Sequence, residues 1–294
     1  MATIGDVAIL FKSYEEITGR ESFQAQIQVA NGDLDRIIGG YDFEREMQLR
    51  CGLNNCNQLH QRGYVIATKH GVETVCGNVC GARELGVDFT EMVARFTARV
   101  DEQKRRQTIQ ELQENAEASL AQCNALKRAV DAVYPALAEI RSELRRDTDI
   151  NRSVELLIRE GGRVRVVQQL TAAERELAVG TKQRANLQTI ATIEGIHALR
   201  DYPKAANVVD ELLKTTKELQ TLDATSVKGR KLSEYTAKIN GFPASLAFLN
   251  QFLEDASAFL TPHNFGSMGK IAKMGAVKEH KLAPILQKII HRFY

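Results

Sequence analysis

The stretch CGLNNCNQLHQRGYVIATKHGVETVCGNVC, residues 51–80, contains four of the five cysteines of this 294-residue chain. Cys51 and Cys56 form one close pair, Cys76 and Cys80 form another, and nineteen residues separate the pairs. Paired cysteines in a cluster are typical of zinc sites, because four thiolates can occupy tetrahedral corners about 2.3 Å from the ion. We therefore predict one structural Zn²⁺ per chain, bound by these four cysteines.

The chain between the two pairs has the pattern of a β-hairpin. Tyr64, Ile66 and Val72 have strand character, and the sequence Lys-His-Gly at 69–71 indicates a turn. The second cysteine pair has the four-residue spacing of side chains on one face of a helix, so we expect a helix to carry both. The N-terminal end of that helix would also favour thiolates.

The first cysteine pair on a tight turn, called a knuckle, is followed by a hairpin and then by a helix with the second pair. This order resembles the TRASH and FCS-type treble-clef zinc fingers. The resemblance covers residues 50–86, and the matching residues are Cys51, Cys56, Tyr64, Cys76 and Cys80. The first cysteines are separated by four residues, where the family has two, and valine precedes the third cysteine, where the family has an aromatic residue. The resemblance implies metal handling and contact with protein or nucleic acid, and it implies no particular reaction.

Other assignments of the cysteines and histidines remain open. The four cysteines can be unliganded, and His60 or His70 can replace one of them as a ligand. A four-cysteine shell is closed, which favours a structural zinc over a catalytic one. The fifth cysteine, Cys123, falls in an apolar helical seam and is expected to be a small buried residue.

Residues 1–88 are predicted to form a β-rich head around this site. Residues 23–29 alternate between apolar and amide side chains, which predicts a strand, and Asn31-Gly32 follows as a turn signal. Residues 43–50 repeat the alternation less regularly. A further short strand is expected within residues 6–11.

Residues 89–222 have the apolar spacing of a long helical hairpin or coiled coil. From Phe89 to Val100, and after a polar stretch from Ile109 to Leu144, apolar residues recur every three or four positions. Pro135 is expected to kink or divide this helix. A glycine pair then breaks the helix, and we place the tip of the hairpin near residues 150–170.

The return of the hairpin is predicted to be mainly helical. Residues 163–170 have the pattern of one short strand, and a capping-box spacing from Thr171 to Glu174 predicts a helix that carries Leu177, Leu187, Ile190 and Ile193. Pro203 is expected to end or kink that helix, and residues 205–222 form the next.

Residues 223–294 are predicted to be a C-terminal helical region with a basic tail. Residues 243–260 form an apolar helix with Pro243 in its first turn, and residues 283–294 form a short amphipathic one. From His263 onward the tail has a net charge of +5. The residues that we single out for contact with nucleic acid are Lys270, Lys273, Lys278, Lys281, Lys288 and Arg292.

The composition sets limits on the class of protein. The chain is 44% hydrophobic and 26% charged with a net charge of +2, which excludes a mainly disordered chain and a basic surface along its whole length. No apolar run reaches the roughly 20 residues of a membrane helix, and the first residues do not have the pattern of a secretory signal. We therefore expect a cytoplasmic protein with no membrane partner.

The predicted fold class is α+β and mostly α. No phosphate-binding loop, dinucleotide fingerprint, nucleophile elbow or HExxH motif occurs, so no enzyme is expected. Our leading hypothesis is a non-enzymatic, zinc-stabilised scaffold that presents its helical arm to a protein partner or to a second copy of itself. The alternative is a nucleic-acid-binding regulator that uses the zinc head or the basic tail.

Overall fold

The computed structural model describes residues 8–169 and 185–293 and has an α+β fold that is mostly helical, as predicted. A small β-rich part lies near the N-terminus and helices follow it. The chain forms two compact units. The first runs to Gln110 and includes Ala224–Thr236, and the second comprises Glu111–Asp223 and Ala237–Tyr294. The division into segments at residues 88 and 222 stays a prediction.

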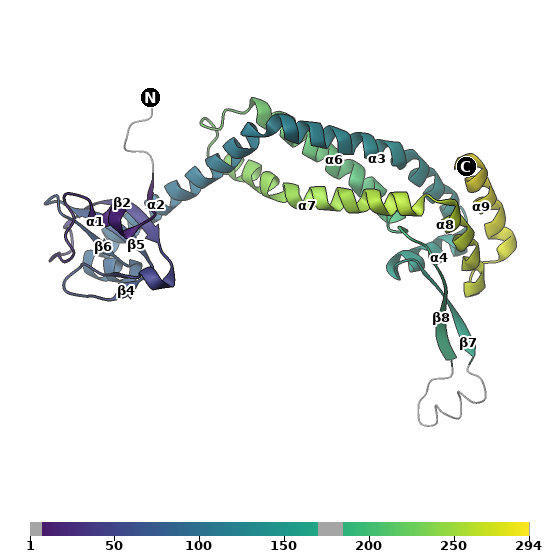
Figure 1. Cartoon of the computed structure of the whole chain (residues 1–294), viewed down its shortest axis with the longest axis horizontal. Coiled ribbons are helices and arrows are strands. Elements are labelled where there is room, and N and C mark those ends of the chain that lie inside the picture. Colours follow the sequence, from purple (N-terminus) through teal and green to yellow (C-terminus); the bar gives the residue numbers. More distant parts are fainter. Residues whose placement is uncertain (1–7, 170–184, 294) are drawn as a thin grey trace, which may run out of the picture. The chain divides into compact units, whose positions relative to one another are not determined.

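The first unit is built on a four-stranded sheet with the order β1-β2-β5-β6 (Figure 1). Its strands are β1 (Ile9–Phe11), β2 (Leu34–Asp42), β5 (Arg62–Thr68) and β6 (Glu73–Cys76). β1 pairs with β2 in parallel, and the other neighbours are antiparallel. The predicted hairpin between the cysteine pairs is confirmed as β5 and β6.

Short elements complete the head. The helix α1 (Tyr14–Thr18) follows β1, the 3₁₀ turn η1 (Arg45–Met47) follows β2, and β3 (Leu49–Arg50) pairs with β4 (Leu59–His60). The predicted strand at 43–50 is therefore wrong except for its last two residues.

The predicted strand at residues 23–29 is also wrong. The segment makes only isolated bridges, at Phe23 with Glu73 and at Ile27 with Leu53. The backbone hydrogen bonds are also divided between two partners. The amide of Gln24 donates to the carbonyl of Glu73, and the amide of Ile27 donates to that of Gly52, each at 2.8 Å. A segment that changes partner within four residues cannot keep a regular ladder, although Phe23, Ile27 and Val29 are still half-buried.

The long helix α2 (Asn78–Glu114) packs its first half on one face of the sheet. Phe89 and Phe96 are buried, and both rings meet the ring of Tyr64 edge-on, at 5.8 and 6.0 Å between centroids. Gly86 divides the helix with a φ of 71°, and a Cβ there would lie 2.9 Å from the Asn31 side chain. Glycine at this position thus lets the helix lie close to Asn31, next to the helix start that carries Cys80.

A nearly buried ion pair joins the loop before residue 23 to β6. Arg20 forms a bidentate bond to the carboxylate of Glu73, whose side chain is only 8% exposed. Arg20→Met leaves this carboxylate buried without its partner, and we expect a loss of about 3 kcal/mol in the free energy of unfolding. Because Arg20 is itself 32% exposed, the value lies at the low end of the range for buried pairs.

Urea denaturation of the two proteins measures this loss. Arg36→Met is the matched control, because its partner Asp35 and Arg36 itself are 43% and 66% exposed, so that the change should cost less than about 1 kcal/mol. Equal midpoints and slopes for both variants would contradict the assigned role of Arg20.

The second unit contains the predicted antiparallel helical hairpin. It is formed by α3 (Ala116–Arg145) and α6 (Ala198–Thr221), which run side by side in Figure 1. Tyr134 meets Tyr202 near one end, and Cys123 meets Thr216 nearer the other, so the two helices run in opposite directions. Cys123 is buried in the seam, as predicted.

The far end of this hairpin differs from the prediction. Between the two helices lie α4 (Thr148–Arg159), the predicted strand β7 (Arg163–Gln169) and β8 (Ala185–Thr192). The capping box at 171–174 and Leu177 lie outside the described residues, but Leu187 and Ile190 belong to β8 and not to a helix. The pairing of β8 with β7, in which Leu187 lies opposite Val167, supplies the backbone bonds that a helix would otherwise have supplied.

Prolines have less effect on these helices than expected. α3 continues through Pro135, and α6 contains Pro203 near its start. The break between α2 and α3 falls at Asn115 instead. A proline removes one intrahelical bond, and the fully buried Val130 and Leu137 hold α3 in the hairpin on both sides of it.

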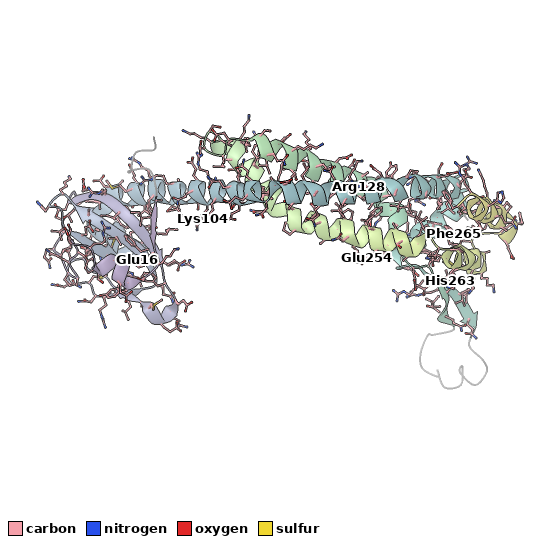
Figure 2. The ribbon with its side chains drawn as sticks, turned by 45° about the horizontal axis from the view of Figure 1, so that its top comes forward. Glu16, Lys104, Arg128, Glu254, His263 and Phe265 are labelled. Atoms are coloured by element: carbon pink, nitrogen blue, oxygen red, sulfur yellow. The ribbon has the colours of Figure 1, made fainter. Side chains whose placement is uncertain are left out.

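The C-terminal region is helical almost throughout. α7 (Gly229–Phe259) begins earlier than predicted and contains Pro243 in its interior, and α8 (Pro262–Met268), the 3₁₀ turn η2 (Gly269–Met274) and α9 (Glu279–Phe293) follow. Phe259 and Phe265 pack together in the core, while Arg128 on α3 and Glu254 on α7 are exposed (Figure 2). Apolar packing therefore orders the basic tail.

Candidate metal centre

The first cysteine pair lies on a tight knuckle between β3 and β4. The amide of Cys51 donates to the carbonyl of Gln58 at 2.9 Å, and the amide of Cys56 donates to that of Leu53 at 2.8 Å. The residues that turn the chain are left-handed, and all are asparagines, the non-glycine residue that tolerates this conformation best: Asn54, Asn55 and Asn57, with φ of 47°, 57° and 53°.

The knuckle is tied to the start of α2. The side chain of Asn54 accepts from the amide of Val29 at 2.8 Å and donates to Glu84 on α2 at 2.7 Å. Gln58 lies against the helix from another side, with its Oε1 3.2 Å from the Sγ of Cys80. These contacts bring the knuckle and the helix together at the cysteines.

Three of the four predicted ligands gather at this junction. The Sγ atoms of Cys51, Cys56 and Cys80 all lie within 4.8 Å of one another, and those of Cys56 and Cys80 are 3.4 Å apart. None of the cysteines forms a disulfide. Zinc with four sulfurs at about 2.3 Å requires sulfur–sulfur distances of about 3.8 Å, and the 3.4 Å between Cys56 and Cys80 is close to that value. The three residues thus fit a metal ion.

Cys76 is placed differently from the prediction. It ends β6, while Cys80 lies in the first turn of α2, so one helix does not carry both. Its thiol lies outside the group of three. It is nevertheless fully buried, and burial first, then the charges of Cys51 and Cys80, raises its pKa. The chain places Cys76 beside the cluster through the strand that precedes the helix.

Burial opposes ionisation of most of these thiols. It raises the pKa of Cys51, and it raises that of Cys80 to about 12. Cys56 is more exposed, and its pKa is lowered, mainly by a hydrogen bond from the backbone of Gln58, with Arg83 3.6 Å away as a weaker cause. A bound cation is the usual agent that makes several adjacent buried thiolates favourable.

Neither histidine joins the cluster among the described residues. The Nδ1 of His60 pairs with the hydroxyl of Tyr41 at 2.9 Å, and its Nε2 is buried with no partner in the described structure. Burial lowers the pKa of His60, which keeps the ring neutral. His70 is exposed at the turn between β5 and β6.

Half of the basic tail residues that we singled out for nucleic acid form ion pairs within the protein. Lys281, Lys288 and Arg292 on α9 pair with Asp147, Glu143 and Glu139 at 3.1, 2.8 and 2.7 Å. The three acids are spaced by four residues, with Glu139 and Glu143 on α3 and Asp147 at the N-cap of α4. This spacing is the sequence signal from which the internal contact could have been predicted.

The remaining tail residues are free for contact. Lys270, Lys273 and Lys278 are exposed, and their side chains make no hydrogen bond or ion pair within residues 8–169 and 185–293.

Comparison with protein-family models, with curated proteins and with solved structures finds no match to this chain. Within the part of the chain that the structure describes, no helix has the length and apolar character needed to cross a membrane.

Proposed function

We propose that this chain is a non-enzymatic interaction protein whose β-rich head is held together by one structural zinc ion. The observation that carries the proposal is the group of three free thiols, Cys51, Cys56 and Cys80, contributed by a knuckle and a helix start. The hairpin separates these two elements in the sequence, and only a few side-chain contacts join them in the structure. A shared ion would cross-link the knuckle to the helix start.

Cys76 is the fourth ligand in this proposal. It is buried beside the other three, its thiol has no hydrogen bond among the described residues, and it lies close enough to Cys51 and Cys80 for their charges to raise its pKa after burial itself. His60 is the weaker candidate, because its Nδ1 already pairs with Tyr41 and the ring lies outside the thiol group. A four-thiolate shell is closed and leaves no coordination position for a substrate.

The second unit supplies the surface that we assign to a protein partner. β7 and β8 project as a two-stranded hairpin from the helices (Figure 1). Val167 and Leu187 lie opposite each other on it and are 69% and 66% exposed. An apolar pair on an isolated ribbon is stabilised when another surface covers it, which favours binding over catalysis as the task of this unit.

The metal content of the purified protein tests the zinc site. Protein prepared without chelator is expected to contain one equivalent of zinc per chain by elemental analysis. Cys123→Ser is the matched control and should retain the same content, because Cys123 lies in the seam of the helical hairpin and not in the head. A content well under half an equivalent in both proteins refutes the structural zinc.

Nucleic-acid binding is the second candidate, and the exposed, unpaired Lys270, Lys273 and Lys278 favour it. Binding of random DNA or RNA at two salt concentrations separates the two functions. Affinity that falls steeply with salt supports nucleic acid. The absence of binding at low salt, together with a defined oligomer by light scattering, supports the interaction protein.

A further inference from the structure

A pocket of about 610 Å³ opens on the head, behind the cysteine cluster. Its floor includes Val75, the residue of β6 that precedes Cys76, and successive residues of a strand point to opposite faces. Val75 belongs to the apolar cluster with Leu49, whereas Cys76 belongs to the cluster with Cys51 and Cys80. The pocket and the thiols therefore use opposite faces of the same strand.

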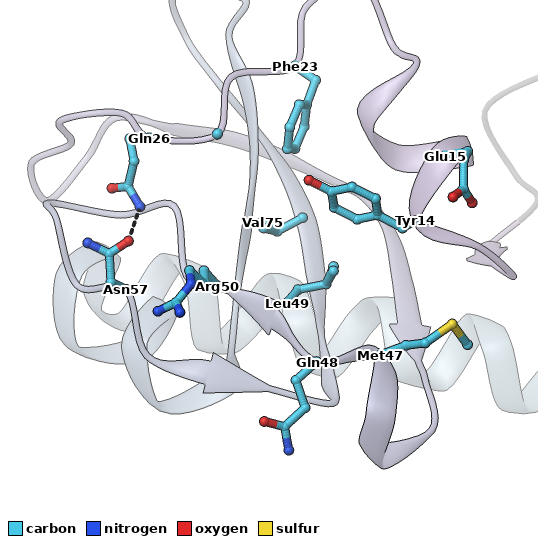
Figure 3. A pocket seen from close by; sticks show the side chains of 11 residues that line it. Tyr14, Glu15, Phe23, Gln26, Met47, Gln48, Leu49, Arg50, Asn57 and Val75 are labelled. Atoms are coloured by element: carbon cyan, nitrogen blue, oxygen red, sulfur yellow. Dashed lines mark hydrogen bonds between the residues drawn. The ribbon is translucent and has the colours of Figure 1, made fainter.

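The middle of the pocket is apolar and aromatic. Figure 3 shows Phe23, Val75, Leu49 and Tyr14 around its centre, with Met47 at the edge. Val75 and Leu49 are buried, while Tyr14 and Met47 are 48% and 50% exposed. An apolar side chain inserted here would cover the exposed walls and be covered by the buried floor. Its transfer from water would therefore lower the free energy of the complex.

The two ends of the pocket carry opposite charges. Arg50 lies at one end beside Gln26 and Asn57, and Glu15 lies at the other (Figure 3). Gln26 is already engaged, since its Nε2 donates to Asn57 at 2.8 Å and to the carbonyl of Cys51 at 3.0 Å. The side chain of Arg50 makes no hydrogen bond or ion pair with any described residue, so its five N–H donors are available to a ligand.

We propose that this pocket binds an extended peptide segment of a protein partner, with an apolar side chain at the centre, a carboxylate toward Arg50 and a cation toward Glu15. The inference rests on the proposed interaction function and names the chemistry of its ligand. Nucleic acid fits less well, because residues 1–88 carry eight Lys or Arg against twelve Asp or Glu, a net charge of −4 that repels phosphates.

The metal site and the pocket are joined by adjacent residues. Arg50 precedes Cys51, Asn57 follows Cys56, and Val75 precedes Cys76. An ion that fixes the cysteines also fixes the backbone from which these lining side chains start. Peptide binding is therefore coupled to zinc.

The test uses zinc-loaded full-length protein and synthetic peptides with a central leucine, an aspartate on one side and a lysine on the other, each separated from the leucine by one to three glycines. Chemical-shift titration is expected to map the best peptide to Tyr14, Leu49 and Val75. Replacing its leucine by glycine, or its aspartate by lysine, should weaken binding at least fivefold.

Charge reversal on the protein gives the sharper result. Arg50→Glu should prefer the peptide with two lysines over the peptide with aspartate and lysine, which reverses the wild-type order. Arg45→Glu is the matched control, because Arg45 is exposed on the neighbouring turn and does not line the pocket, and it should keep the wild-type order.

Each remaining outcome decides one of the two proposals. Protein with a full equivalent of zinc that binds no peptide, or whose preference is unchanged by Arg50→Glu, refutes the peptide pocket and leaves the zinc site standing. Protein that purifies without zinc and still shows the charge-dependent binding refutes the structural zinc and its coupling to the pocket, and supports the pocket itself. Binding of an oligothymidine at Tyr14 and Phe23 in place of the peptides overturns the peptide assignment in favour of nucleic acid.

Discussion

Replacing any one of Cys51, Cys56, Cys76 or Cys80 by serine is expected to abolish stoichiometric zinc binding and to destabilise the head by several kcal/mol. The binding free energy of a structural zinc is also folding free energy, and three thiolates with one missing corner leave the shell incomplete. Cys51 and Cys76 should be the most severe, because both are completely buried and a serine there also buries a hydroxyl. Zinc content and thermal unfolding of the single variants measure both effects.

Cys123→Ser is the internal control for this series. The Sγ of Cys123 lies 3.9 Å from the hydroxyl of Thr216, so a serine finds a hydroxyl neighbour and the carbonyl of the preceding turn. We expect a cost of about 1–2 kcal/mol and no loss of zinc.

The ligand set is wrong if Cys123→Ser loses the metal while one of the four variants in the head keeps it. If Cys76→Ser alone keeps a full equivalent, Cys76 is not the fourth ligand, and His60→Phe becomes the decisive variant. The His60 ring would then be the alternative donor, through its Nε2, which has no partner in the described structure.

Removal of zinc by a chelator is expected to disorder the head and leave most of the helix signal in place. The second unit has its own apolar core, in which Leu137, Ile140, Leu212 and Phe252 take part and none of the four head cysteines does. The first turns of α2 lie in the head and carry Cys80, so a small loss of helix signal is expected from that segment.

Far-ultraviolet circular dichroism measures the helices, and amide exchange of residues in the head measures the head. The change in tyrosine fluorescence on chelation is a second measure, although Tyr134 and Tyr202 of the second unit contribute a constant part of it. Tyr41 and Tyr64 are buried or half-buried in the head and should become exposed on chelation. Re-addition of zinc should restore both signals. Loss of the whole helix signal would mean that the two units unfold as one.

Local patterns predicted the parts of this protein whose partners lie close in the sequence. The β5–β6 hairpin follows from alternation around a glycine turn, and the seams of α3 and α6 follow from apolar residues three and four apart. The cysteine spacing predicted a metal cluster, and three of its members meet. In the strands and helices, the short period of apolar residues indicates directly which face is buried.

The patterns failed where a segment takes its hydrogen bonds from a distant partner. Residues 23–29 alternate like a strand but divide their bonds between residue 73 and the knuckle. Leu187 and Ile190 continue a row of apolar residues with helical spacing, yet they belong to β8, which pairs with β7. Periodicity cannot choose between two structures that bury the same residues, so the choice depends on which backbone partner is near.

The sequence by itself determined the fold class, the hairpin between the cysteine pairs, the helical seams and the cysteines as candidate ligands. Only the tertiary structure decided that Cys76 ends a strand while Cys80 begins a helix, and that α9 uses its basic residues on α3. It alone also assembled the pocket, because Tyr14, Phe23, Arg50 and Val75 come from four separate segments. Such a site has no period or spacing, since its members are brought together only when the sheet and the knuckle pack.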